Sequence, residues 1–228
     1  MPDMLQVVVP DVIWVTERPV WFSGVRLRAR STVVRLEDGG LWLHSPPLPT
    51  DAVCAALDAL GPVRWLVVPN CFHHLATPAF AARYPEARVV GPSSALGHNP
   101  ELHLHETLEG GPEMPGIDQR YLAGVPFLDE TVFFHRPTGT LIAADLVLSA
   151  GPSDHFTWRT AARLTGCYGR VAVPPDVRKK TKASKLAADA IDALLALPVQ
   201  RLLVAHADPI EDRPLEQLAE AWRFVRPG

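Results

Sequence analysis

The sequence predicts an α/β protein built as a four-layer αββα sandwich, in which two β-rich layers pack face to face with helices outside. Strand-like segments followed by strand–helix alternation occur once in each half of the 228 residues. Several apolar runs that suit buried strands are followed at once by histidine or aspartate. With 47% apolar residues, the chain is able to bury a full core as a single domain spanning 1–228.

The first half begins with strands and turns. Residues 12–15 form an apolar run, 25–30 alternate apolar with basic residues, and segments 31–36 and 41–44 flank the turn signal Glu37-Asp-Gly-Gly40. Asp51 is expected to cap a helix through about Leu60, where apolar residues recur at helical spacing. The following segments predict strands at 64–68, 88–90, 102–105 and 119–122, with a helix at 78–84.

The second half begins with a hairpin. Residues 131–135 pair with 140–144 across the turn Arg136-Pro-Thr-Gly139. Helices are expected at 153–165 and 182–197, then a strand that ends on His206, and finally a helix at 214–225.

Composition excludes several classes of function. A net charge of −3 gives no electrostatic basis for binding nucleic acid or an anionic membrane. The amino end, Met1–Gln6, has no signal-peptide pattern, and no uncharged apolar run reaches the roughly 18 residues of a membrane helix. Cys54, Cys71 and Cys167 lack the spacing of a disulfide framework. A cytoplasmic protein is therefore expected, acting on a small-molecule substrate.

Ligand-type side chains follow three of the predicted strands. His73 and His74 come after the strand at 64–68, and Asp145 and His206 each end a later apolar run. Ligands in open α/β structures gather at the carboxyl ends of strands, so these four side chains are expected to share one edge. Imidazole and carboxylate together suit zinc, iron or manganese. The sequence therefore predicts a metal site.

The order of these segments resembles the metallo-β-lactamase fold, and more closely the uncharacterised branch of that superfamily called DUF4336. The segments that carry the resemblance extend over most of the chain: Val68-Pro-Asn-Cys-Phe-His-His-Leu75, Phe127-Leu-Asp-Glu-Thr-Val-Phe-Phe-His-Arg-Pro137, Thr140-Leu-Ile-Ala-Ala-Asp-Leu146 and Ala205-His-Ala-Asp-Pro-Ile210. The resemblance implies the αββα architecture of that superfamily. It implies no settled function for this branch.

The departures from the superfamily pattern imply a reduced metal site. In the common His-x-His-x-Asp-His loop, Pro69 and Cys71 replace the two leading histidines, and Gly124 is followed by Val125 where a third histidine is usual. The first metal position has therefore lost its histidines. The counterparts of the second position are His73, His74, Asp145 and His206. One divalent ion is expected, with Asp145 and His206 as catalytic residues.

The chemistry implied is metal-dependent hydrolysis. Three neutral imidazoles and one carboxylate give a divalent site a net charge of about +1, which favours a small anionic substrate and activation of water. Redox chemistry on iron is an alternative, and so is a non-catalytic or metal-free binding module that keeps the fold. A metal-free serine hydrolase is a further reading, because Gly91-Pro-Ser-Ser-Ala95 approaches a nucleophile elbow at Ser93.

Four other residues are candidates for a supporting role. Asn70 is expected to hold the histidine loop by hydrogen bonding its own backbone. Cys71 is either a soft ligand or an apolar filler, His155 is a further ligand or substrate contact, and Asp208 is expected to orient His206. The basic run at 178–185 is either a solvated helix start or a guide for an anionic substrate.

Overall fold

The computed structural model describes residues 5–226, which divide into two compact units. Unit 1 contains the described residues up to Arg18 and then Arg30–Ile117, and unit 2 contains Pro19–Ala29 and the described residues from Asp118 onward. The chain passes between the units within strands β2 (Ile13–Phe22), β3 (Val25–Arg35) and β8 (Ile117–Tyr121). The amino end, for which no signal segment is expected, lies partly outside the described residues.

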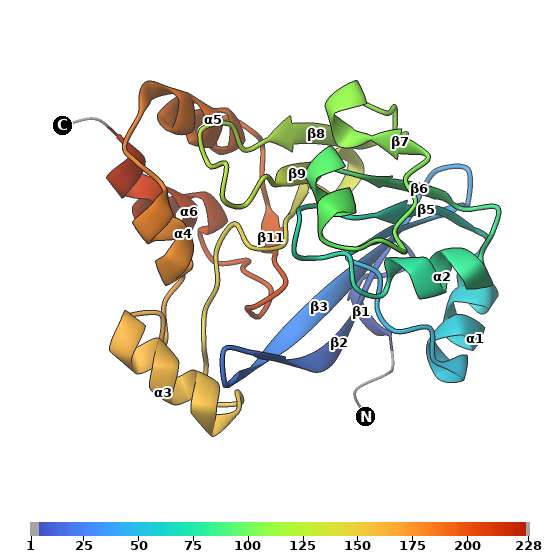
Figure 1. Ribbon diagram of the computed structural model, residues 1–228, viewed down its shortest axis with the longest axis horizontal. Helices are drawn as coiled ribbons and strands as arrows, with labels where there is room; N and C mark the ends of the chain where they lie inside the picture. Colours follow the sequence, from blue (N-terminus) through green and yellow to red (C-terminus); the bar gives the residue numbers. More distant parts are fainter. Residues whose placement is uncertain (1–4, 227–228) are drawn as a thin grey trace. The chain divides into compact units, whose positions relative to one another are not determined.

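A seven-stranded sheet with the order β1-β2-β3-β4-β5-β6-β7 forms the framework of unit 1 (Figure 1). β1 pairs antiparallel with β2 and β3 antiparallel with β4, whereas β4 through β7 are parallel. Besides β2 and β3, its strands are β1 (Gln6–Val9), β4 (Leu41–His44), β5 (Val63–Val67), β6 (Arg88–Gly91) and β7 (Glu106–Thr107). β5 is a central parallel strand in which every residue except the exposed Arg64 is apolar and buried.

Two helices, α1 (Asp51–Leu60) and α2 (Thr77–Arg83), pack against this sheet in unit 1. Leu57 of α1 and Phe80 of α2 are fully buried in one cluster with Leu43 and Leu66 of the strands. The expected cap at Asp51 is wrong by one residue. Thr50 caps α1, since its Oγ1 accepts a hydrogen bond from the backbone N–H of Val53 at 3.3 Å.

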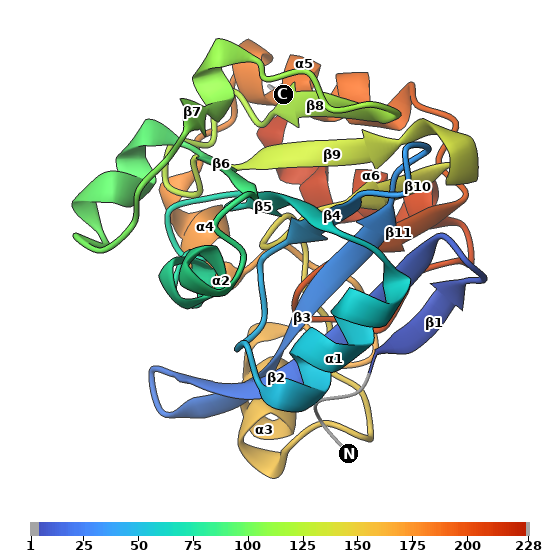
Figure 2. The same ribbon diagram turned by 90° about the vertical axis from the view of Figure 1, so that its right-hand side faces the viewer.

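Unit 2 is built on a four-stranded sheet with the order β11-β10-β9-β8. The hairpin of β9 (Thr131–His135) and β10 (Thr140–Ile142) is antiparallel as expected, and β11 (Arg201–Leu203) lies parallel to β10. Figure 2 shows α5 (Lys185–Leu195) and α6 (Pro214–Trp222) next to this sheet, and their apolar faces form one buried cluster with it. The other helices of unit 2 are α3 (Phe156–Thr165) and α4 (Pro175–Lys180).

Several elements differ from those predicted. β1 was not expected, and residues 102–105 are irregular instead of forming a strand. Leu102 N–H donates to the Asn99 carbonyl, and the paired residues of β7 and β6 begin at Glu106 and Val90. The basic run at 178–185 is divided between the end of α4 and the start of α5. β10 and β11 end at Ile142 and Leu203, so Asp145 and His206 lie in the loops that follow these strands.

Four short 3₁₀ helices complete the secondary structure of residues 5–226: η1 (Ser93–Gly97), η2 (Leu108–Gly110), η3 (Arg136–Thr138) and η4 (Arg223–Val225). In this described part of the chain, no helix has the length and apolar character needed to cross a membrane.

Candidate metal site

Asp145 is positioned in unit 2 by a buried carboxylate. It follows β10 by three residues, and its backbone N–H donates to Glu130 Oε2 at 2.9 Å. The other oxygen of the same carboxylate, Oε1, accepts from the Ala144 N–H at 2.7 Å. Glu130 has no exposed surface. Glu130 therefore fixes the backbone from which the Asp145 side chain projects, because it accepts hydrogen bonds from two N–H groups just beyond the end of β10.

His206 reaches Asp145 because β10 and β11 are parallel neighbours in the unit 2 sheet. The pairing continues past the strands, where Ala143 N–H donates to the Leu203 carbonyl and Ala205 N–H to the Ala144 carbonyl, at 2.9 and 3.1 Å. Both chains thus leave the sheet at the same edge. His206 Nε2 lies 3.3 Å from Asp145 Oδ1, and both side chains are largely buried.

The hydrogen bond at Nδ1 of His206 determines whether Nε2 carries a proton in the neutral ring. His206 Nδ1 lies 2.5 Å from the backbone carbonyl oxygen of Arg28. A carbonyl oxygen can only accept, so Nδ1 carries a proton and donates it. In the neutral imidazole, Nε2 is then an unprotonated acceptor that faces the Asp145 carboxylate. Two acceptors at this separation repel each other unless a cation or a proton lies between them.

Electrostatics in unit 2 favour a positive charge at this position. Burial lowers the pKa of His206, but the hydrogen bond and charge of Asp145, the Arg28 carbonyl and the charge of Glu130 outweigh it, and the pKa is raised. The carboxylates thus produce a negative potential at the imidazole. Either an imidazolium proton or a metal ion satisfies that potential.

The geometry of the pair fits a metal ion. Ligand nitrogen and oxygen atoms lie about 2.0 to 2.2 Å from zinc, so two ligands at right or tetrahedral angles are about 2.8 to 3.6 Å apart. The 3.3 Å between His206 Nε2 and Asp145 Oδ1 falls in that interval. The Nδ1 hydrogen bond to a backbone carbonyl is also the usual arrangement behind a histidine that binds metal through Nε2.

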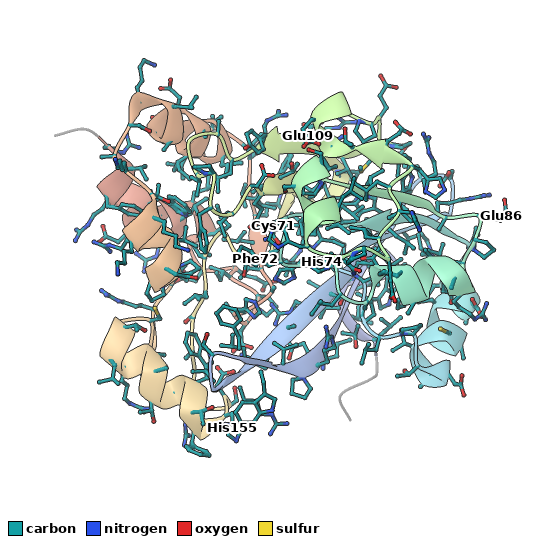
Figure 3. The ribbon with its side chains drawn as sticks, viewed as in Figure 1. Cys71, Phe72, His74, Glu86, Glu109 and His155 are labelled. Atoms are coloured by element: carbon teal, nitrogen blue, oxygen red, sulfur yellow. The ribbon has the colours of Figure 1, made fainter. Side chains whose placement is uncertain are left out.

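The histidine loop of unit 1 is held as the sequence predicts. Asn70, which is fully buried, accepts hydrogen bonds at Oδ1 from the backbone N–H groups of Phe72 and His73, at 2.9 and 3.0 Å. This closed turn follows β5 directly and precedes α2, and Figure 3 marks Cys71, Phe72 and His74 along it. His73 is half-buried, and His74 and Cys71 are buried.

His74 is held by a side chain that the sequence did not single out. Asn99 Oδ1 accepts from the Glu101 N–H at 3.1 Å, which fixes the amide so that its Nδ2 faces His74 Nδ1 at 3.3 Å. His74 Nδ1 therefore accepts, and its proton lies on Nε2. Burial and the nearby His98 and His73 lower the pKa of His74, so the ring is neutral.

The supporting residues are placed differently from the expectation. Asp208 pairs at 2.7 Å with the Arg28 guanidinium. The acceptor for His206 Nδ1–H is the Arg28 carbonyl instead. His155 (Figure 3) caps α3, where its Nδ1 accepts from the Thr157 N–H. Its ring contacts that of Trp21 edge-on. Arg28 and Glu130 were not singled out from the sequence. Glu130 did carry a signal, because it is an acidic residue directly before an apolar strand.

The hydroxyl that would be needed for a serine hydrolase has another role. Ser93 Oγ donates to Glu109 Oε1 at 2.7 Å, and the Ser93 backbone N–H donates to the same oxygen at 2.9 Å. A nucleophilic serine needs a histidine acceptor instead. This arrangement disfavours the elbow interpretation of 91–95.

The fold is that of the metallo-β-lactamases. A metallo-β-lactamase from Pontibacter korlensis superposes with a TM-score of 0.65 at 13% identity, covering 97% of this chain and 99% of its own. One from Hirschia baltica gives a TM-score of 0.68 at 14% identity with 100% of both chains covered. The DIM-1 metallo-β-lactamase exposed to ceftazidime gives 0.68 at 13% identity, with 96% of each chain covered.

Sequence comparison places the chain in a family. No protein of curated function matches it in sequence. The model of the family described as "Domain of unknown function (DUF4336)" matches residues 10–156, which is more than half of the chain. The resemblance noted from the sequence is thereby confirmed, and the chain belongs to the DUF4336 family.

Proposed function

We propose that this protein binds one divalent metal ion and hydrolyses a small, anionic substrate. The observation that carries the proposal is the distance of 3.3 Å between His206 Nε2 and Asp145 Oδ1. Both atoms are acceptors when the imidazole is neutral, because its single N–H proton is on Nδ1 and is donated to the Arg28 carbonyl. The proposed ligands are the four residues that the resemblance implies, His73, His74, Asp145 and His206. Zinc, iron and manganese suit these donors.

His74 differs from the other proposed ligands, because its hydrogen bond with Asn99 competes with metal binding. Its Nε2 carries the proton while Asn99 donates to Nδ1, so it offers a lone pair only when the Asn99 contact breaks. A catalytic zinc site needs only three protein ligands and keeps a further position open for water or substrate, so the proposal does not require His74. His74 then serves to hold the loop through Asn99.

The residues divide the work of hydrolysis between them. A bound divalent ion lowers the pKa of water and polarises a carbonyl or phosphoryl oxygen of the substrate. Glu130 holds the Asp145 backbone and the Arg28 carbonyl holds the His206 ring, so neither side chain needs to reorganise. Asp145 would also accept a proton in the reaction, through the carboxylate oxygen that does not hold the metal ion.

Two further expectations belong to this proposal. The whole chain, 1–228, acts as one domain of the fold, which is supported by the 96 to 100% of this chain that the solved structures cover. The protein works in a reducing compartment such as the cytoplasm, which is supported by three buried cysteines that are all free thiols.

The alternative function is a metal-free binding module, and one observation favours it. An imidazolium proton would also satisfy the Asp145–His206 pair, because the pKa of His206 is raised. The two readings therefore differ in which cation lies between these side chains, and metal analysis distinguishes them.

The test is metal content and titration of the purified protein. The wild type is expected to bind about one equivalent of zinc, iron(II) or manganese, and Asp145→Ala and His206→Ala are expected to lose it. His103→Ala and Asp212→Ala, at exposed positions, are the matched controls and should keep it. If the wild type retains no ion after addition of each metal and gel filtration, the metalloenzyme proposal is wrong and the binding-module reading stands. Loaded protein is then assayed on anionic carboxylic and phosphate esters.

A further inference from the structure

Arg28 makes three different connections within unit 2. Its guanidinium Nε donates to Asp154 Oδ1 at 2.8 Å, and a second nitrogen lies 3.4 Å from Asp154 Oδ2. A third nitrogen donates to Asp208 Oδ1 at 2.7 Å. Its backbone carbonyl accepts from His206 Nδ1 at 2.5 Å. One residue of β3 therefore holds the loop of His206 by side chain and by main chain together.

The anchor of this arrangement is Asp154. Its side chain is only 2% exposed, and besides the forked contact with Arg28 it accepts from the Gly151 N–H at 2.8 Å. A buried carboxylate with a forked guanidinium and a backbone donor is strongly directional. Asp208, by contrast, is 65% exposed, so its pair with Arg28 is the weaker of the two.

The strand itself orients the residue. Side chains alternate between the two faces of a strand, and Val25 and Leu27 of β3 pack against the apolar cluster of Trp158 and Ala162 from α3. Arg28 consequently projects from the other face of the strand.

We propose that Arg28 is a positioning residue for His206. Its guanidinium, fixed by Asp154 and Asp208, keeps its own carbonyl on Nδ1 and so selects the tautomer in which Nε2 presents a lone pair toward Asp145. The consequence for metal binding rests on the proposed function, whereas the selection of the tautomer does not. Histidine ligands that lose such an orienting hydrogen bond typically weaken metal affinity by about 10- to 100-fold.

The test uses one variant series with two readouts. The variants are Arg28→Met, which removes the charge but keeps the length, and Arg28→Lys, which keeps the charge without the fork. Arg26→Met, on the same face of the same strand, is the matched control. The first readout is the ¹⁵N chemical shifts of the His206 ring in metal-free protein at a pH where the ring is neutral. The second is the dissociation constant for zinc and for manganese.

The expected results separate the two proposals. Wild type and Arg26→Met should show the Nδ1–H tautomer alone. Arg28→Met should show a mixture of tautomers and bind metal about 10- to 100-fold more weakly. Arg28→Lys should lie between wild type and Arg28→Met in both tautomer ratio and metal affinity. Unchanged tautomer and unchanged affinity in folded Arg28→Met would overturn the inference. If the tautomer changes while even the wild type binds no metal, the positioning role stands and the metalloenzyme proposal fails.

A second variant covers the possibility that Arg28→Met does not fold. Asp208→Asn changes an exposed side chain and leaves the buried Asp154 contact in place. It is expected to shift the tautomer in the same direction, by less. A folded Asp208→Asn protein with the wild-type tautomer, together with a folded Arg28→Lys protein that also keeps it, would refute the role of the guanidinium.

Discussion

Replacing Glu130 by glutamine removes a charge from the interior of unit 2 with almost no change in shape. In the wild type both carboxylate oxygens accept backbone N–H groups, those of Ala144 and Asp145, at 2.7 and 2.9 Å. The glutamine amide has one oxygen, so its NH₂ must face one of these two donors. The variant loses one charge-assisted hydrogen bond, which contributes about 1.5 to 3 kcal/mol, and leaves a buried N–H without its acceptor.

We expect the free energy of unfolding to fall by about 3 kcal/mol, which for a chain of this size lowers the Tm by roughly 6 to 12 °C. Urea unfolding followed by circular dichroism measures the first quantity, and hydrogen exchange at the Ala144 and Asp145 amides locates the effect. Glu216→Gln is the control, because its carboxylate is 71% exposed and its pair with Arg213 contributes little. If Glu130→Gln loses no more stability than Glu216→Gln, Glu130 does not hold this loop.

Three other substitutions test the fold. The buried His135 has its pKa lowered from 6.5 to about 4 by desolvation and by Arg136, so the folded state binds fewer protons than the unfolded chain. The contribution of the neutral His135 to the free energy of unfolding is complete above pH 6.5 and is lost as the pH falls toward 4. In parallel urea titrations the wild type should therefore lose about 3 kcal/mol relative to His135→Gln over this range. Thr50→Ala removes the acceptor for Val53 N–H and should cost about 1 kcal/mol by the same assay, whereas Thr50→Ser should cost less. Trp222 is only 1% exposed, and its Nε1–H donates to the Leu146 carbonyl at 3.0 Å. Trp222→Phe removes this donor and should lower the free energy of unfolding by about 2 to 4 kcal/mol. A smaller loss of stability than for Thr50→Ala would contradict this packing.

The parts of the site that follow from strand ends could be predicted from the sequence. Asp145 and His206 follow apolar runs that are recognisable as strands, and the rule that ligands gather at carboxyl ends places them together. In unit 2 the two side chains lie 3.3 Å apart, although both strands end earlier than expected. Asn70 was also predictable, since an Asn after a proline at a strand end commonly accepts from the backbone ahead of it.

The remaining parts could not be predicted, for identifiable physical reasons. The group that orients His206 is a main-chain carbonyl, which every residue carries, so no sequence pattern marks Arg28 as the residue that supplies it. Asp208 was the natural expectation because it is close in sequence. The cap of α1 was ambiguous, because Thr50 and Asp51 are both good capping residues and tertiary context decides between them. Asn99 acts on His74 across 25 residues and belongs to no motif.

The pairing of Arg28 with Asp208 has a consequence for how the chain is made. The two residues are 180 positions apart, so on a ribosome that adds 5 to 20 residues per second the outer end of the β2–β3 hairpin is synthesised roughly 10 to 35 s before its partner. During that interval its basic side chains and the exposed Trp21 and Phe22 are available to chaperones or to other nascent chains. Unit 2 combines this early segment with the last part of the chain, so its completion is a late event in folding.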